Sequence, residues 1–356
     1  MSRAKLRLCL SALFVFTLVI GVMGASASPA FASALYLRQF GSVGGGNGQF
    51  HGPWGVAVDS AGNVYVADVG NARVEKFSGI GTFMGAWPIY NPSGSPWEVA
   101  VDHLGNVWVA DLWNNYVEEF TSAGVEIQEW DGSASGSQYA LNGPAGMAFD
   151  PSGNIYVVSS NDGYVKEYTS AGAFIRQWDG TSSGQAFTYG GIWGIATDSS
   201  GNVYTFDNGL SRVAEFTGTG GYIRQWGSAG TGNGQFNNAW DIAVDSHNMV
   251  YVADSANCRV QEFTPTGAYV GQWGSQGSGN GQFTPSVEGW GPGGLFVSSS
   301  GNAYVSDYGG NRIEEFMVGP AVNTPASSDW SLALLAIIGL GVAALVTRQV
   351  RAEDSI

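Results

Sequence analysis

A short motif, Asp-x-x-Gly-Asn, recurs along this chain at a nearly constant spacing and restricts the folds that the chain can adopt. Its six copies are DSAGN at 59–63, DHLGN at 102–106, DPSGN at 150–154, DSSGN at 198–202, and the degenerate DSHNM at 245–249 and SSSGN at 298–302. Successive copies are 43 to 53 residues apart. A period of about 45 residues with several short alternating segments per unit is typical of a β-propeller, in which each repeat forms one four-stranded blade. Six copies predict six blades.

The first repeat shows most clearly how each unit divides into four strands. Its expected strands are GVAVD at 55–59, NVYVAD at 63–68, RVEKF at 73–77 and GTFMGAW at 81–87. Apolar residues alternate in the first of them, as in a strand with a buried face. Between the first two strands, we expect Asp59 to close an Asx turn and Gly62 to adopt a positive φ, which glycine tolerates. The sequence therefore predicts an all-β fold of antiparallel blades.

The last repeat lacks its fourth strand, and the first segment after the leader resembles one. The sixth unit stops after RIEEF at 312–316, whereas ALYLRQF at 34–40 precedes the first unit. Phe40 stands where a tryptophan ends the fourth strand of the other five units, at Trp87, Trp130, Trp178, Trp226 and Trp273. We expect the N-terminal strand to complete blade six, because closing the ring in this way leaves no unpaired strand edge.

The first 32 residues have the pattern of a secretory signal peptide. Basic residues lie within 3–7, an apolar run follows at about 8–23, and small residues end the segment with Ala-Phe-Ala at 30–32. This order of basic, apolar and small residues is that of a cleaved signal. We expect a signal peptide at 1–32 and a propeller at 33–318; an uncleaved anchor is the alternative.

The C-terminal end predicts a membrane tether. A spacer with Pro and Ser at 319–330 leads to 331–347, which is uncharged, mostly apolar and just long enough to cross a bilayer as one helix. Arg348 and Arg351 follow it, so the short tail at 348–356 is expected in the cytoplasm and the propeller on the secreted side. The spacer, helix and trailing arginines resemble prokaryotic C-terminal sorting tails, and we expect a prokaryotic cell-surface location.

Charge and cysteine content exclude two classes of function. The formal net charge is −15, so the chain lacks the basic surface that a nucleic-acid partner requires. Cys9 lies within the predicted signal peptide, which leaves Cys258 alone in the mature chain. A single cysteine provides neither a disulfide nor a thiolate metal cluster.

Two long segments carry a family resemblance. GQFHGPWGVAVDSAGNVYVADVGNARVEKF at 48–77 and GQFNNAWDIAVDSHNMVYVADSANCRVQEF at 234–263 resemble the NHL repeat, and the similarity extends over about 35–316. The resemblance implies a six-bladed propeller. It leaves function open, since the family includes protein-binding, RNA-binding and sensor domains. Related six-bladed propellers include amidating lyases, which hold zinc with three histidines, and gluconolactonase-like enzymes, which use a metal in the channel.

Most residues that suggest chemistry are explained better by the scaffold. His51 is expected on one rim of the propeller and His103 and His247 on the other, too far apart to share one zinc ion. The loops GGGNG, GTGNG and GSGNG lack the Lys-Ser/Thr and the helix of a phosphate-binding loop, and we interpret them as links between blades. An Asp that ends the second strand and an Arg that opens the third recur in most units, which favours a structural pair.

The entrance to the first strand of each blade provides the candidate site. The aligned pairs are Trp54-Gly55, Trp97-Glu98, Ala145-Gly146, Trp193-Gly194, Trp240-Asp241 and Gly293-Gly294. Blades one and four match, as do two and five, and three and six, so the channel mouth is expected to have approximate two-fold symmetry. Glycine fits where backbones crowd the axis, and Glu98 and Asp241 depart from that rule. The tryptophans either pack between blades or form a ligand platform.

From these residues we expect a non-catalytic binding or sensing module for a protein or glycan ligand. The candidate ligand-binding residues are Trp54, Trp97, Glu98, Trp193, Trp240 and Asp241. The alternative is a metal-dependent lyase or lactonase-like enzyme that uses Glu98 and Asp241, with Glu288 in a nearby loop as a third ligand. A structural envelope protein is a second alternative. We predict no catalytic residue and no cofactor, although a divalent metal in the channel stays open.

Overall fold

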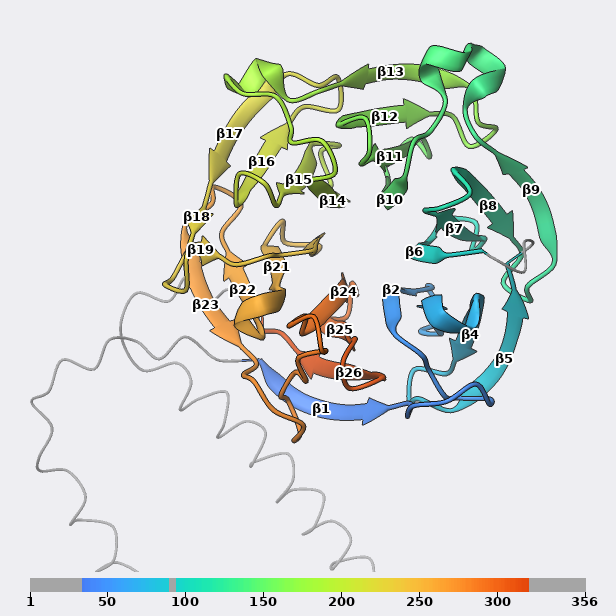
Figure 1. Ribbon diagram of the computed structural model, residues 1–356, viewed down its shortest axis with the longest axis vertical. Helices are drawn as coiled ribbons and strands as arrows, with labels where there is room; N and C mark the ends of the chain where they lie inside the picture. Colours follow the sequence, from blue (N-terminus) through green and yellow to red (C-terminus); the bar gives the residue numbers. More distant parts are fainter. Residues whose placement is uncertain (1–33, 90–93, 320–356) are drawn as a thin grey trace, which may run out of the picture. The chain divides into compact units, whose positions relative to one another are not determined.

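The computed structural model describes residues 34–89 and 94–319, and this region forms a six-bladed β-propeller (Figure 1). The predicted signal peptide, transmembrane helix and cytoplasmic tail lie outside the described residues, as does the spacer beyond 319. Within 34–89 and 94–319, no helix is long and apolar enough to cross a membrane.

Each blade is an antiparallel sheet of four strands. Blade one contains β2 (Pro53–Val58), β3 (Val64–Asp68), β4 (Arg73–Phe77) and β5 (Phe83–Pro88). Blade two contains β6 (Pro96–Val101), β7 (Val107–Asp111), β8 (Tyr116–Phe120) and β9 (Glu126–Trp130). Blade three contains β10 (Pro144–Phe149), β11 (Ile155–Ser159), β12 (Tyr164–Tyr168) and β13 (Phe174–Trp178).

The other three blades follow the same order. Blade four contains β14 (Ile192–Thr197), β15 (Val203–Asp207), β16 (Arg212–Phe216) and β17 (Tyr222–Trp226). Blade five contains β20 (Asp241–Val244), β21 (Val250–Asp254), β22 (Arg259–Phe263) and β23 (Tyr269–Trp273). Blade six contains β24 (Pro292–Val297), β25 (Asn302–Asp307), β26 (Arg312–Met317) and β1 (Leu35–Phe40).

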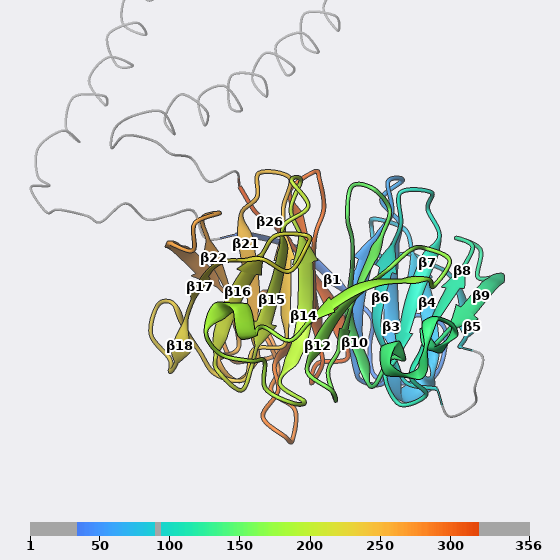
Figure 2. The same ribbon diagram turned by 90° about the horizontal axis from the view of Figure 1, so that it is seen from above.

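Short elements lie in the loops on one side of the disc, where the second strand leads to the third or the fourth strand leads to the next blade; Figure 2 shows the disc edge-on. They are the 3-10 helices η1 (Val69–Asn71), η2 (Ser133–Ser135), η3 (Ser137–Tyr139), η4 (Thr181–Ser183) and η5 (Ser255–Asn257), and the parallel pair β18 (Ser228–Ala229) and β19 (Gln235–Phe236). The sequence did not predict these short elements, although η1 and η5 occupy the same turn in two matching repeats.

The N-terminal strand closes the ring, as predicted. β1 pairs antiparallel with β26, from Leu35 opposite Met317 to Phe40 opposite Ile313, so the first and last described segments share blade six. In Figure 1 this blue strand lies against the red end of the chain. The ladder hydrogen bonds of β26 are thereby satisfied on both sides, which is why the sixth repeat needs no fourth strand of its own.

The recurring Asp-x-x-Gly-Asn motif forms the turn between the first and second strands of a blade. In blade one, Asp59 Oδ1 accepts hydrogen bonds from the backbone N–H groups of Ala61 and Asn63, at 2.9 and 2.8 Å, and Gly62 has a φ of +82°. The degenerate copies keep this turn by other means. Asn248 adopts a φ of +61° in blade five, and Ser298 Oγ accepts the N–H of Asn302 in blade six.

Neighbouring blades pack through an aromatic ring and a glycine. Gly81 has a φ of +82°, and a Cβ added to it would lie 2.8 Å from the ring of Phe40, which ends the outer strand of blade six. Gly124, Gly172, Gly220 and Gly267 lie in the same way against Trp87, Trp130, Trp178 and Trp226. An aromatic residue at or next to the end of each of these outer strands therefore packs on the third-to-fourth-strand turn of the next blade.

The recurring Asp and Arg form the structural pair that the sequence predicts. Arg73 Nε lies 2.9 Å from the buried carboxylate of Asp68, and its guanidinium also donates to the carbonyl oxygens of Gly46 and Gln49. Arg259 and Arg312 make the corresponding contacts in blades five and six. Each pair holds one of the three glycine-rich loops in place, so these loops connect blades.

Candidate functional site at the two ends of the channel

The first strand of each blade lies innermost and lines the central channel (Figure 1). Backbones crowd one another where these strands begin. A Cβ added to Gly55 would lie 2.7 Å from Glu98 Cα, and one added to Gly194 would lie 2.7 Å from Asp241 Cα. Each carboxylate thus sits against a glycine of the blade before it, and the expectation that glycine fits the crowded axis is confirmed at both positions.

Four tryptophans close the channel where the first strands begin. The ring centroids are separated by 4.4 Å for Trp54 and Trp97, 5.5 Å for Trp97 and Trp193, 4.9 Å for Trp193 and Trp240, and 5.2 Å for Trp240 and Trp54. These contacts form a closed circuit that skips blades three and six, where Ala145 and Gly293 provide the space. The four candidate tryptophans are therefore brought together by contact with one another.

Two further aromatic residues complete this cluster. Trp290, from the loop before β24, lies 6.0 Å from Trp54 and 5.4 Å from Trp240 between ring centroids, and Tyr308, after β25, lies 5.3 Å from Trp54. We call these six residues the aromatic plug. Trp54 is 2% exposed and Trp240 8% exposed, whereas Trp97 and Trp193 remain half-buried. Sequence alignment of the repeats missed Trp290 and Tyr308, because neither occupies a repeating position.

Beyond the plug, the channel contains a cavity of about 220 Å³. Glu98 and Asp241 lie at the plug end of it, because each directly follows a plug tryptophan in the sequence. The walls are almost entirely apolar, and all six first strands contribute two to four residues each from the same four aligned positions. Val101, Phe149, Thr197 and Val244, which line the far end, are half-buried. The cavity therefore opens toward the first-to-second-strand turns, opposite the tryptophans.

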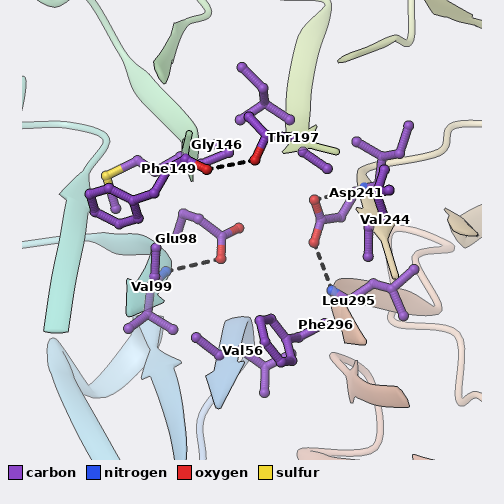
Figure 3. A pocket seen from close by; sticks show the side chains of 18 of the residues that line it. Val56, Glu98, Val99, Gly146, Phe149, Thr197, Asp241, Val244, Leu295 and Phe296 are labelled. Carbon is purple, nitrogen blue, oxygen red and sulfur yellow. Dashed lines mark hydrogen bonds between the residues drawn. The ribbon is translucent and has the colours of Figure 1, made fainter. Parts of the chain in front are cut away.

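The two carboxyl groups face each other across this cavity (Figure 3). Asp241 Oδ1 accepts the N–H of Ile242 at 2.8 Å, and its Oδ2 accepts the N–H of Leu295 at 2.7 Å. Glu98 Oε1 accepts the N–H of Val99 at 3.0 Å. Among the residues that the structure describes, no donor is hydrogen-bonded to Glu98 Oε2. One oxygen of a side chain that is only 9% exposed is thus unpartnered and directed into the cavity.

Burial controls the protonation of the pair. It raises the pKa of both carboxyl groups, and the charge of Asp241 raises the pKa of Glu98 further. The two backbone N–H groups that donate to Asp241 favour its ionised form. Two facing carboxyl groups in an apolar cavity cannot both ionise without a large electrostatic penalty. The pKa of Asp241 rises to about 7 and that of Glu98 rises well above its ordinary value, so near neutral pH the pair keeps at least one proton, mainly on Glu98.

The third acidic candidate does not join this pair. Glu288 is exposed in the loop before Trp290, where its Oε2 accepts a hydrogen bond from Ser286 Oγ at 3.1 Å. Burial raises the pKa of Tyr308, a plug residue, and the negative charge of Glu288 raises it further. Glu288 is not among the residues that line the cavity. In the part of the chain that the structure describes, no three His, Cys, Asp or Glu side chains are grouped so that they could hold a metal ion.

The histidines lie on the surface. His51, His103 and His247 are all exposed, and they belong to different loops. His51 precedes β2 on the plug face, while His103 and His247 lie in first-to-second-strand turns at the open end of the cavity. This arrangement agrees with their predicted places on opposite rims and provides no three-histidine site.

Comparison with known families supports the repeat assignment. The model of the NHL repeat matches residues 50–77 and 236–263. These segments run from β2 to the end of β4 in blade one and from β19 to the end of β22 in blade five, so the two matches cover equivalent parts of two blades.

Solved structures share the fold at low sequence identity. Virginiamycin B lyase from Staphylococcus aureus is 16% identical, with 80% of this chain and 88% of that chain covered and a TM-score of 0.53. A gluconolactonase from Xanthomonas campestris is 14% identical, with 77% and 88% covered and a TM-score of 0.58. A protein of unknown function from Bacteroides thetaiotaomicron is 17% identical, with 79% and 76% covered and a TM-score of 0.61. These similarities establish the common propeller fold.

Proposed function

We propose that this chain, a six-bladed β-propeller that carries NHL repeats, is a binding module whose channel receives a small ligand. The observation that carries the proposal is the unpartnered Glu98 oxygen in an otherwise apolar cavity. That oxygen faces the cavity, so a ligand that enters can donate a hydrogen bond to it. A concave apolar site with few convergent polar groups and shifted pKa values is the usual form of a ligand pocket.

The aromatic plug gives this pocket a closed end. Its six rings pack against one another, so a ligand that enters from the turn side would stop at the two carboxyl groups. A binding site benefits from such rigidity because less conformational entropy is lost when the ligand binds. The plug would therefore support binding by holding Glu98 and Asp241 in place.

A second candidate function is recognition of a protein or glycan at the plug face. It is favoured by Trp97 and Trp193, which are half-buried, and by Trp113, which is 70% exposed in the turn after β7. Exposed aromatic rings are common contacts for sugars and for protein partners. In this account the plug face and the channel pocket are separate sites on opposite sides of the carboxyl pair.

The lyase and lactonase names of the structural neighbours suggest an enzyme as the alternative. Two facing carboxyl groups, one protonated and one ionised, could act as general acid and general base on a lactone. A metal-dependent version needs more ligands than this pair provides. Turnover of a lactone panel, with and without Ca²⁺, Mn²⁺ or Zn²⁺, would favour the enzyme; binding without turnover would favour the module.

For the whole chain we propose export by residues 1–32 and attachment at the secreted side of the membrane by residues 331–347. The tail at 348–356 would then lie in the cytoplasm. Protease accessibility of the propeller on intact cells, compared with cells that express the chain truncated after 330, tests this placement.

The binding function is tested by filling the pocket. Phe296 in blade six and Ala148 in blade three occupy the same register in opposite blades, so Ala148→Phe would add another ring to the cavity. We expect small molecules that raise the unfolding midpoint of the protein to lose that effect in this variant. Ala123→Phe, in the exposed turn between β8 and β9, is the matched control. Equal midpoint shifts in both variants would contradict the proposal.

A further inference from the structure

We infer that the channel pocket binds small organic ammonium ions, with the charged nitrogen between Glu98 and Asp241 and the carbon body against the apolar walls. This inference rests on the proposed function and adds the ligand class. It draws on three observations about the cavity: which side chains carry charge, which donors the oxygens still require, and what surrounds the open end.

Only acidic groups carry charge in this cavity. Of the residues that line it, Glu98 from β6 and Asp241 from β20 are the ionisable ones. The lining parts of β2, β10, β14 and β24 contribute apolar side chains and Thr197, whose Oγ1 donates to the carbonyl oxygen of Phe149 at 2.6 Å. No Lys, Arg or His among the described residues lines the pocket to neutralise the pair. A cationic ligand would supply the missing counter-charge.

The hydrogen-bonding capacity of the pair suits an ammonium group. Glu98 Oε2 is unpartnered, and each oxygen of Asp241 accepts a single backbone hydrogen bond, so further lone pairs are available. An ammonium ion offers several N–H donors that could bind both carboxylates at once. A calcium ion requires about six to eight oxygen ligands, which the Val, Ala, Ile, Leu and Phe walls do not provide. The donor set therefore favours an organic cation over a metal ion.

The open end of the cavity is also acidic. An aspartate directly follows the first strand in five of the six blades, at Asp59, Asp102, Asp150, Asp198 and Asp245. Their carboxylates accept the backbone hydrogen bonds of the Asx turns. His103 and His247 lie in the same turns. Like charges around a narrow apolar opening concentrate the field and attract cations toward it.

The size of the cavity limits the ligand. A cavity of about 150 Å³ accommodates benzene, so the 220 Å³ found here would hold a molecule of about nine non-hydrogen atoms. Benzylamine, cyclohexylamine and butylamine fall within this limit. Each has a neutral alcohol with the same carbon skeleton, which allows the contribution of the positive charge to be isolated.

Binding should release a proton. Near neutral pH the empty pair holds at least one proton, whereas an ammonium ion that contacts both groups favours two carboxylates. The ligand keeps its own protons, and the Glu98 carboxyl loses its proton to the solvent. The affinity should therefore increase with pH until the free amine itself begins to lose its charge.

The test is isothermal titration of the three amines and three alcohols into the purified protein at several pH values, in buffers that differ in ionisation enthalpy. We expect the amines to bind at least about tenfold more tightly than their alcohols, with release of up to one proton. Glu98→Gln should remove both the preference and the proton release. Glu129→Gln, on the exposed outer strand of the same blade, should leave both unchanged.

The possible results separate this inference from the proposed function. Alcohols that bind as tightly as amines, with affinity lost in Ala148→Phe, would overturn the ammonium inference and leave the pocket intact. Amine binding that persists in both Glu98→Gln and Ala148→Phe would place the amines outside the pocket and overturn the inference. If Glu98→Gln fails to fold, pH-independent amine binding to the natural protein would overturn it.

Discussion

Trp54 and Trp240 pack edge to face with their ring centroids 5.2 Å apart, although blade six lies between their blades. Gly293 permits this contact. It occupies the aligned position in blade six, and a Cβ added there would lie 3.4 Å from the Trp54 ring. A Cβ at that distance would just touch the ring, so the plug depends on small residues at 293 and 145 as well as on the tryptophans themselves.

Truncation of the plug should destabilise the propeller. Trp54→Ala removes a nearly buried indole that contacts Trp97, Trp240, Trp290 and Tyr308, and should lower the free energy of unfolding by about 3–5 kcal/mol. Trp113→Ala, at an exposed position on the same face, should change it by less than about 0.5 kcal/mol. Urea unfolding measures both; equal effects would mean that the plug is not a packed unit.

Removing the charge of Glu98 should stabilise the fold at high pH. Its pKa is raised by burial and by Asp241, so its contribution to stability is present below the unfolded pKa of about 4.5 and is lost as the pH rises. Glu98→Gln keeps the acceptor for Val99 N–H and should raise the free energy of unfolding by about 1–3 kcal/mol at pH 8, less at pH 5. Denaturant unfolding across this pH range tests the sign. A destabilised variant at pH 8 would contradict it.

The ionisation of Glu314 should likewise lower the stability of the fold as the pH rises, because this carboxyl group is buried within a blade. It is fully buried in β26, and burial raises its pKa to about 8 although Arg312 opposes the shift. Its stabilising contribution is therefore lost between an unfolded pKa of about 4.5 and the folded value of about 8. Gln261 occupies this position in blade five, where it accepts the N–H of Gly234 and donates to Gln235 O.

Glu314→Gln should accordingly flatten the dependence of stability on pH. We expect a gain of about 2 kcal/mol in the free energy of unfolding at pH 9 and little change at pH 5. Glu126→Gln, at an exposed position on β9, is the control and should follow the natural protein at both pH values. Identical pH profiles for the natural protein and Glu314→Gln would show that this carboxyl group does not titrate as described.

In the Asp-Arg pairs, the hydrogen bonds of the guanidinium group should contribute more to stability than its charge does. Arg259→Lys retains the charge near Asp254 but loses the planar donors to Gly232 O, Gln235 O and Gln272 Oε1. We expect a loss of about 2–3 kcal/mol in the free energy of unfolding, with increased proteolysis of the loop at 228–237. Arg224→Lys, at a partly exposed pair with Glu215, should cost less than about 1 kcal/mol. Equal losses would indicate that charge alone is responsible.

Local rules made much of this fold predictable from the sequence. The Asx turn at Asp59 needs only an Asp and a residue that tolerates positive φ, so counting these turns gave the blade number. The missing strand after β26 and the surplus strand at 35–40 then required closure of the ring. Strand limits shifted by a residue or two; β2, for example, begins at Pro53, before the predicted 55.

The site was predictable only in part. Alignment of the repeats placed the four tryptophans, Glu98 and Asp241 together, because repeating positions occupy equivalent places around the axis. It could not decide whether the indoles pack between blades or on one another, since that depends on the space left by Gly293 and Ala145. The cavity beyond the carboxyl pair was also out of reach, because its volume depends on side chains from six strands.

The most direct test of the central proposal is a crystal structure of the protein soaked with 4-bromobenzylamine, whose bromine is located by anomalous scattering. We expect one bromine peak inside the channel, on the side of the first-to-second-strand turns, and the nitrogen within hydrogen-bonding distance of Glu98 and Asp241. A peak on the outer face of Trp97 and Trp193, with an empty channel, would contradict the account and support the plug face as the binding site.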